Sequence, residues 1–238
     1  SEAIWSLTHR LNARIIFDAT VSLSGFWIKI AQICSVSPAL PEAYSIELSK
    51  LQDSVPPCSI EHVMRTLSED FGPHWENRII LHDGPPLGCA TIAQVHRAKI
   101  RPRLGSDFTD GVIKVQHPGI KENLYLDMHA AGLIANALKL LNSKMFRDFP
   151  AIFREIAELT LAELDFRTEA ENQKMARLEL SETSLPVMVP EVFSDLVSSR
   201  ALAMEFVNGQ KITDYVKNGG NAQRIVQTVC EYFATSVL

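Results

Sequence analysis

Hydrophobic residues in the first seventy-odd positions recur at the period of an α-helix. Leu7, Leu11 and Ile15 are each four residues apart, so they share one face and predict a helix over Glu2–Phe17. The same period predicts three further helices, at Thr20–Val36, at Glu42–Leu51, and from an N-cap at Ser59 to a stop at Gly72–Pro73. The chain is therefore expected to begin with an all-α segment.

After this segment the pattern changes to short β-type runs separated by turn residues. Five runs predict strands, at Arg78–His82, Ile92–Ile100, Val112–Val115, Val192–Leu196 and Arg200–Phe206. Four runs predict helices, at Ile120–Leu141, Phe149–Leu180, Ile212–Val216 and Ala222–Leu238. We therefore expect an α+β fold, in which an antiparallel sheet of about five strands has long helices on one side.

One lysine interrupts the predicted strand at Val112–Val115. Lys114 stands between Ile113 and Val115, so the two-residue period of a strand directs its side chain to the face opposite both neighbours. A strand lysine on a concave face reaches phosphate groups, whereas one on an outer face is merely solvated. From these residues alone both interpretations stay open.

An acidic cluster lies within nine residues of the second long predicted helix. Its members are Glu163, Asp165, Glu169 and Glu171. Asp165 and Glu169 are four residues apart, so on a helix they repel each other by roughly 0.2–0.5 kcal/mol unless a cation lies nearby. Lys114 and Lys29 are candidates because both stand among apolar residues. The alternative is a solvated acidic face partnered by Arg167 and Lys174.

Composition and charge narrow the class of protein. At 238 residues and 46% hydrophobic, the chain is long enough for one large core or two modest ones. The net charge is −5 and the pI is about 5.8, so the chain lacks the excess of positive charge that is typical of nucleic-acid-binding proteins. Nucleic acid is therefore not expected as a partner. Four cysteines without CxxC or Cys/His spacing indicate reduced thiols and no metal site. We expect neither a signal or transit peptide nor a membrane-spanning helix, because the longest apolar tract, Met128–Leu141, is interrupted by polar residues.

Several longer stretches agree in order and spacing with one family. They are LQDSVPP at Leu51–Pro57, TIAQVHRA at Thr91–Ala98, VIKVQHPGI at Val112–Ile120, ELDFRTEAEN at Glu163–Asn172 and RALAMEFVNG at Arg200–Gly209. Together they resemble the UbiB (aarF-domain) family of atypical kinase-like proteins, which is linked to coenzyme Q and other prenyl-lipid metabolism. The resemblance runs collinearly from about Lys29 to Gly209, which is more specific than one short motif.

This resemblance implies a fold and a domain organisation. Residues 1–76 are expected to form a helical KxGQ-type extension, residues 77–209 a protein-kinase-like small lobe with inserted long helices, and residues 210–238 the start of a large lobe. In kinases the Asp that orients the nucleophile and the Asn and Asp that hold Mg²⁺ lie beyond the hinge, in the large lobe. No catalytic residue and no metal ligand is therefore assigned in this chain, and Mg²⁺ is expected only in a full-length protein.

The resemblance also implies a site for ATP or ADP. The residues assigned to it are Gly88, Cys89, Ala90, Thr91, Lys114, Glu169 and Glu205. The segment Gly88–Thr91 resembles the Ala-rich loop of the family, which lies over the phosphates, and Glu205 lies in the stretch that resembles the hinge. Lys114 is implied to contact the phosphates and to pair with Glu169.

Four more residues are implied to be regulatory. Lys29 and Gln32, from the KxGQ element, are expected to meet Glu163 and Asp165 across the place where a peptide substrate would otherwise bind. That arrangement implies an ATPase or a small-molecule kinase rather than a protein kinase. The chain departs from the family at Ala31, which stands where KxGQ has glycine and adds a methyl group to any close backbone approach.

The segment Gly88–Thr91 also departs from the family, because Gly88 restores a glycine to a segment that is usually alanine-rich, and this is expected to loosen its nucleotide preference. Two functions follow from the resemblance. The first is the ATP-binding portion of a UbiB-type atypical kinase or ATPase, with a prenyl lipid or membrane surface as a further partner. Its expected location is the matrix side of the mitochondrial inner membrane or a plastid. The second is a catalytically inactive, pseudokinase-like scaffold within an assembly of other protein subunits.

Overall fold

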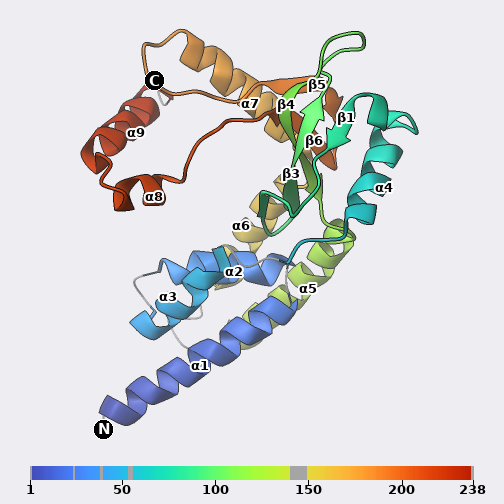
Figure 1. Ribbon diagram of the computed structural model, residues 1–238. Coiled ribbons are helices and arrows are strands. Elements are labelled where there is room, and N and C mark those ends of the chain that lie inside the picture. The colour runs from blue at the N-terminus through green and yellow to red at the C-terminus, as the bar shows by residue number, and fades with distance from the viewer. Residues whose placement is uncertain (1, 24, 38–39, 53–55, 140–148, 237–238) are drawn as a thin grey trace.

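Three helices and a short turn of 3-10 helix form one end of the protein (Figure 1). The computed structural model describes residues 2–23, 25–37, 40–52, 56–139 and 149–236. The elements of the helical end are α1 (Glu2–Leu23), α2 (Gly25–Ser35), α3 (Glu42–Ser49) and η1 (Lys50–Gln52). They enclose a small core of Ile28, Ala31, Leu48 and Leu51. The predicted all-α beginning is confirmed.

The boundary between the first two helices was predicted too early. The prediction ended the first helix at Phe17 and began the second at Thr20, but α1 continues to Leu23. Thr20 is buried and Val21 packs against the small core, so both prolong the packed face of α1. Gly25, the first residue of α2, has φ 47°, a conformation that glycine adopts without strain, and the chain changes direction there.

The sheet follows the helical end and is antiparallel throughout. Its strands run in the order β1 (Ile79–Leu81), β3 (Ala93–Ile100), β4 (Thr109–Gln116), β6 (Ala201–Glu205) and β5 (Val192–Val197). A sixth strand, β2 (Gly88–Cys89), pairs with β3 beside this series and is too short to leave a periodic signal in the sequence. Strands β3 and β4 form the predicted hairpin, with Ala93 opposite Gln116 and Ile100 opposite Thr109.

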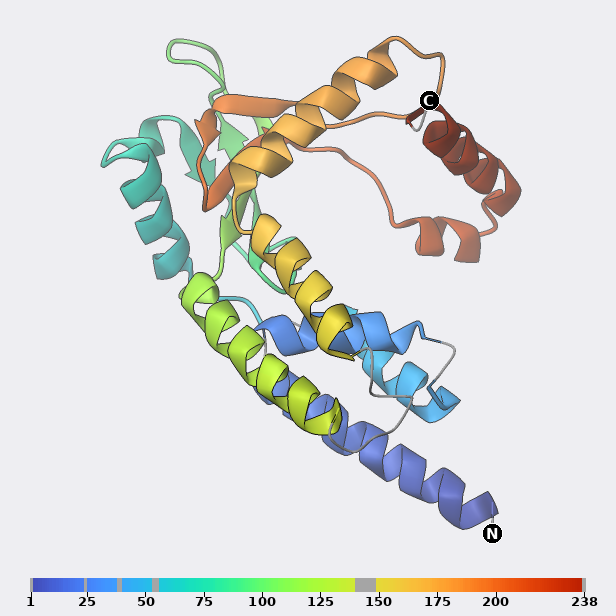
Figure 2. The same cartoon turned by 180° about the vertical axis from the view of Figure 1, so that it is seen from behind.

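Helices cover both faces of the sheet, whereas the sequence predicted helices on one side only. On one face α4 (Ile60–Phe71) buries Val63 and Leu67 against Ile113 and Val115 of β4. Ser59 caps this helix as predicted, and the 3-10 turn η2 (Trp75–Asn77) adds Trp75 to the same core. On the other face α7 (Phe166–Ser181) packs Phe166 and Ala170 against Leu202 (Figures 1 and 2).

The long helix predicted over Phe149–Leu180 is two helices. The first, α6 (Phe149–Ala162), packs with α5 (Ile120–Lys139) and α2, and their core contains Phe26, Leu124 and Ile156. The second is α7, whose N-cap is Asp165 in extended conformation. Residues 163–165 therefore form a corner. The predicted end of the preceding helix, residues 140–141, lies outside the described residues.

The C-terminal helices stand apart from the sheet. A stretch without regular structure leads from β6 to α8 (Ile212–Lys217) and α9 (Ala222–Ser236), which lie to one side of the sheet (Figure 1). Along α9, Val229 and Phe233 are exposed. Among the helices in the described ranges, none combines the length and the apolar character that crossing a membrane requires.

Candidate functional site

The site is built around an ion pair between the sheet and the helix that covers it. Lys114 Nζ, from β4, lies 2.7 Å from each carboxylate oxygen of Glu169, on α7. The same ammonium lies 4.6 Å from the centre of the Phe166 ring, within range of a cation–π interaction. The predicted pairing of Lys114 with Glu169 is confirmed, and the alternative of a merely solvated strand lysine is wrong.

The exposure of this pair determines how it acts. The Lys114 side chain is 20% exposed and the Glu169 side chain 39%, so water still screens the attraction and its contribution to stability is on the order of 1 kcal/mol. One ammonium that contacts both oxygens of one carboxylate is nevertheless restricted in direction. The pair therefore acts mainly by fixing the position of a positive charge on this face of the sheet.

The segment Gly88–Thr91 lies two strands away from Lys114, in the same row of residues. Gly88 of β2 is opposite Val95 of β3, and Val95 is opposite Lys114 of β4. Because adjacent strands are about 4.8 Å apart, this row places the segment roughly 10 Å from the lysine backbone. Ala90 N donates to Ala93 O at 2.7 Å, which closes the segment into a tight turn.

His117, directly after β4, supports this turn. His117 Nε2 lies 2.9 Å from Ala90 O, and since a carbonyl only accepts, the imidazole must donate. Burial holds the pKa of His117 below its ordinary value, so the ring is neutral at pH 7 and carries its proton on Nε2 in this arrangement. The Gly88–Thr91 segment is thus tied to the end of β4 by one side chain.

Gln94 is a second supporting residue that sequence reasoning missed. Its side chain is fully buried on β3, where Oε1 accepts from Cys58 N at 2.7 Å and Nε2 lies 2.8 Å from His96 Nε2. Cys89 Sγ also approaches Gln94 Oε1, at 4.0 Å. Its place in the two-residue period of Ala98 and Ile100, which are both buried, was the signal that could have identified it, because buried amides need partners.

Lys29 and Glu163 meet as predicted, but Gln32 does not join them. Lys29 Nζ lies 2.5 Å from Glu163 Oε1, which connects α2 to the corner between α6 and α7. Gln32 Nε2 instead donates to Leu51 O at 3.0 Å, so the expected contact of Gln32 with Glu163 or Asp165 is wrong. Gln32 lies on the side of α2 that faces η1, and it closes the helical end.

Asp165 also differs from the expectation. It contacts Arg167 through a bidentate ion pair with distances of 2.9 Å from Nε to Oδ1 and 2.6 Å from Nη2 to Oδ2. It also accepts from Arg167 N at 3.0 Å as the N-cap of α7. Hydrogen bonding to Arg167 lowers the pKa of this carboxyl. The predicted nearby cation is therefore confirmed, and for Asp165 it is Arg167, the partner that the alternative named. The placement of Asp165 within the same helix as Glu169 is wrong, because Asp165 precedes α7 and favours its positive end.

Glu205 lies at the end of β6, where the sheet leads into the C-terminal stretch. Its Oε2 accepts from Glu191 N at 3.1 Å and lies 3.6 Å from Arg177 Nη1 of α7. Its backbone N donates to Glu191 O at 2.8 Å. The side chain thus clamps β6 to the start of β5, and contact with a nucleotide stays a prediction for this residue. Within the described ranges, no three His, Cys, Asp or Glu side chains gather closely enough to hold a metal ion.

A lysine on a central antiparallel strand, bonded to a glutamate on the helix packed over it, is the arrangement of a protein-kinase small lobe. The family model of the ABC1 atypical kinase-like domain matches residues 50–238. The chain belongs to this family, which also carries the names aarF and UbiB.

Relatives and one solved structure agree with this assignment. The chain is 30% identical to the protein ACTIVITY OF BC1 COMPLEX KINASE 8, chloroplastic, of Arabidopsis thaliana, over 87% of this chain and 27% of that protein. It is 30% identical to AarF domain-containing protein kinase 1 of Mus musculus, over 88% of this chain and 38% of that protein. The chain thus spans well under half the length of these curated relatives.

The solved structure is that of Rv3197 from Mycobacterium tuberculosis in complex with erythromycin. It superposes with a TM-score of 0.56 at 25% identity and covers 94% of this chain and 55% of that one. The predicted α+β, kinase-like small lobe with N-terminal helices is therefore confirmed.

Proposed function

We propose that this chain is the nucleotide-binding portion of an atypical kinase or ATPase, and that ATP or ADP binds between the Gly88–Thr91 segment and Lys114. The observation that carries the proposal is the ion pair of Lys114 with Glu169, because kinases hold nucleotide phosphates with a lysine that is oriented in this way. We also propose that residues 1–76, 77–209 and 210–238 are the helical extension, the small lobe and the start of the large lobe.

The residues present fit a nucleotide. Lys114 keeps a fifth of its side chain exposed, so the ammonium is fixed in position yet accessible to a phosphate oxygen. A Cβ built on Gly88 meets no atom within 4 Å, which leaves room beside the segment. When bound, the nucleotide supplies the phosphoryl group. Lys114 binds its phosphate oxygens, Glu169 directs the ammonium, and Mg²⁺ ligands come from a large lobe in the full-length protein.

The regulatory part of the proposal concerns Lys29 and Glu163. Their ion pair links the helical extension to the corner that precedes α7, the helix that carries Glu169. Such a bridge restricts movement of α7 relative to the extension and occupies the side where a peptide would approach. This supports a small-molecule kinase or ATPase over a protein kinase.

The metabolic role and location rest on family membership. We propose that the full-length protein supports coenzyme Q or other prenyl-lipid metabolism at a membrane surface, on the matrix side of the mitochondrial inner membrane or in a plastid. The word chloroplastic in the name of the Arabidopsis relative supports an organelle. A lipid and other protein subunits are the further partners that we propose.

Titration of the intact protein with a fluorescent ADP analogue tests the proposal. Lys114→Ala should weaken binding at least tenfold, because a charge-assisted hydrogen bond contributes roughly 1.5–3 kcal/mol. The matched control is Lys99→Ala, which removes a lysine from the neighbouring strand, where Lys99 pairs with Asp110 and is 44% exposed. Equal affinity of the Lys114→Ala variant and the wild type would refute the proposed site.

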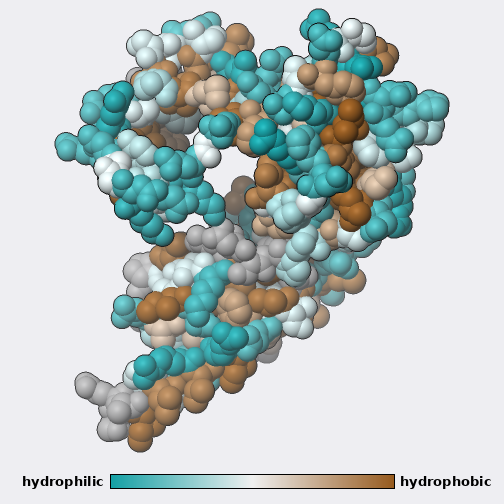
Figure 3. Space-filling view, viewed as in Figure 1, coloured by the Kyte–Doolittle hydropathy of each residue, from teal (hydrophilic) through white to brown (hydrophobic). Residues whose placement is uncertain are grey.

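A scaffold without catalysis is the second candidate, and the outer face of α1 favours it. Large apolar side chains are exposed along this helix, and a brown stripe marks it in the space-filling view (Figure 3). They include Ile4, Trp5, Leu11 and Ile15, which are 55% or more exposed. An apolar face of this kind marks an interaction surface. The intact protein should then show no Mg²⁺-dependent ATP hydrolysis above its Lys114→Ala variant, whereas measurable hydrolysis would exclude this candidate.

A further inference from the structure

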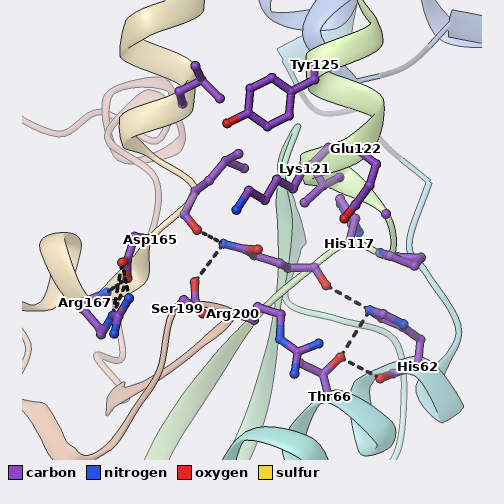
Figure 4. A pocket seen from close by; sticks show the side chains of 16 residues that line it. His62, Thr66, His117, Lys121, Glu122, Tyr125, Asp165, Arg167, Ser199 and Arg200 are labelled. Carbon is purple, nitrogen blue, oxygen red and sulfur yellow. Dashed lines mark hydrogen bonds and ion pairs between the residues drawn. The ribbon is translucent and has the colours of Figure 1, made fainter.

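A pocket of about 640 Å³ lies at the end of the sheet where β4 leads into α5. Its walls come from α4, the turn before α5, the first turns of α5, the corner between α6 and α7, and the turn between β5 and β6 (Figure 4). Neither Lys114 nor Glu169 lines it, so it is distinct from the candidate nucleotide site. Its volume is in the range of pockets that hold small molecules.

Gln116 holds the walls of this pocket together. The residue is 6% exposed, and its Nε2 donates to Leu164 O at 2.6 Å and to Ser199 O at 2.9 Å. Its backbone O lies 3.1 Å from His62 Nε2 of α4. One buried residue thus connects four segments, and the pocket is formed before any ligand arrives.

Two polar side chains of α5 project into the pocket. Lys121 and Tyr125 are one helical turn apart, and both extend into the open space (Figure 4). Within the described residues, neither the ammonium of Lys121 nor the hydroxyl of Tyr125 has a hydrogen bond or an ion pair. The two arginines of the lining differ, because Arg167 is bound by Asp165 and Arg200 by Asp70 and Glu69.

We propose that this pocket binds a small organic phosphate. An unpaired ammonium and an unpaired hydroxyl on adjacent turns are donors for phosphate oxygens, and Leu161 and Leu164 supply an apolar wall for the organic part. The lining carries three cations and only two carboxylates, Glu122 and Asp165. Since Asp165 is bound by Arg167, Glu122 is the carboxylate that opposes an anion.

The pocket also touches the candidate nucleotide site through His117. This residue lines the pocket, and its Nε2 donates to Ala90 O in the Gly88–Thr91 segment. A ligand that displaces His117 changes the support of that segment. We therefore expect the phosphate ligand to alter nucleotide affinity, an effect that rests on the proposed nucleotide function, whereas binding to the pocket does not.

Calorimetric titration of the intact protein with phenyl phosphate tests the proposal. Lys121→Gln should weaken binding about tenfold, Tyr125→Phe should weaken it less, and Glu122→Gln should strengthen it. Lys174→Gln, which removes an exposed lysine on α7 outside the pocket, is the control and should change nothing. An unchanged thermal midpoint in each variant shows that the fold is retained.

Lys114→Ala separates the two sites. It should weaken nucleotide binding at least tenfold and leave phenyl phosphate binding intact, whereas Lys121→Gln should weaken phenyl phosphate binding about tenfold and leave nucleotide binding intact. Loss of phenyl phosphate binding in Lys114→Ala, or an affinity that Lys121→Gln does not change, would overturn the pocket proposal. Benzoate binding as tightly as phenyl phosphate would overturn the assignment to phosphate. If nucleotide fails to bind while Lys121-dependent phenyl phosphate binding persists, the proposed function fails and the pocket stands.

Discussion

Gly88 and Lys114 lie in one row of the sheet, on opposite sides of Val95. The glycine thus belongs to the same surface that carries the lysine ammonium. A side chain at position 88 has free space in the protein alone, but it would project beside the position that we propose for the phosphates.

Close packing requires glycine at position 111, whereas position 88 has room for a side chain. A Cβ on Gly111 would lie 2.6 Å from Ile100 Cδ1 and 2.9 Å from the backbone O of Met204. Gly111→Ala should therefore lower the free energy of unfolding by about 1–3 kcal/mol, because backbone and core must shift. Gly88→Ala should leave it unchanged and alter only nucleotide affinity. Urea unfolding of both variants checks this, and equal stabilities would contradict the packing argument.

The ion pair at the site should affect binding more than folding. Glu169→Gln keeps the size of the side chain and removes its charge, so stability should fall by roughly 0.5–1 kcal/mol, as for a partly exposed pair. Nucleotide affinity should fall as well, because Lys114 loses the group that orients it. Glu171→Gln, on an exposed position of the same helix, is the control. An affinity equal to that of the control would show that Glu169 has no orienting role.

Ala31 is expected to matter for the stability of the helical end. Its side chain is 5% exposed and packs with Ile28, Leu48 and Leu51. Ala31→Gly should cost about 1 kcal/mol, because glycine disfavours the helix and the buried methyl group is lost. Thermal unfolding measures this loss. A variant as stable as the wild type, but with changed nucleotide affinity, would instead indicate a direct role of this position at the site.

Mild acid should destabilise the protein through two histidines. Burial keeps the pKa values of His96 and His117 below the ordinary value, so both rings stay neutral in the folded state. As the pH falls below about 6.5, the unfolded chain takes up protons that the folded state excludes, and the free energy of unfolding decreases.

Urea unfolding at pH 7.5 and pH 5.5 measures this effect. Carboxylates with lowered pKa, such as Asp165, act only at more acidic pH and do not confuse the comparison. The double variant His96→Gln and His117→Gln should show a shallower dependence in this window. An equally steep dependence would assign the effect to other groups.

Regular patterns made part of this structure predictable. The β3–β4 hairpin and the direction of Lys114 follow from a two-residue period, and the pairing of Lys114 with Glu169 followed from family resemblance. The corner at residues 163–165 was missed because apolar residues continue across it at helical spacing. Its cause is long-range, since Gln116 binds Leu164 O and Phe166 N donates to Ser199 O. The hydrogen bond of Gln32 was also missed for a long-range reason, because its partner Leu51 is distant in sequence.

The cover that α4 lays over the sheet has a consequence for shortened forms of the protein. Val63 and Leu67 shield Ile113, Val115 and their neighbours from water. A chain that began after α4 would expose this hydrophobic face of the sheet, and an exposed hydrophobic sheet surface favours self-association. Proteolytic removal of the N-terminal helices up to α3, which ends at Ser49, would spare this cover, whereas a cut beyond Phe71 would remove it and favour self-association of the sheet.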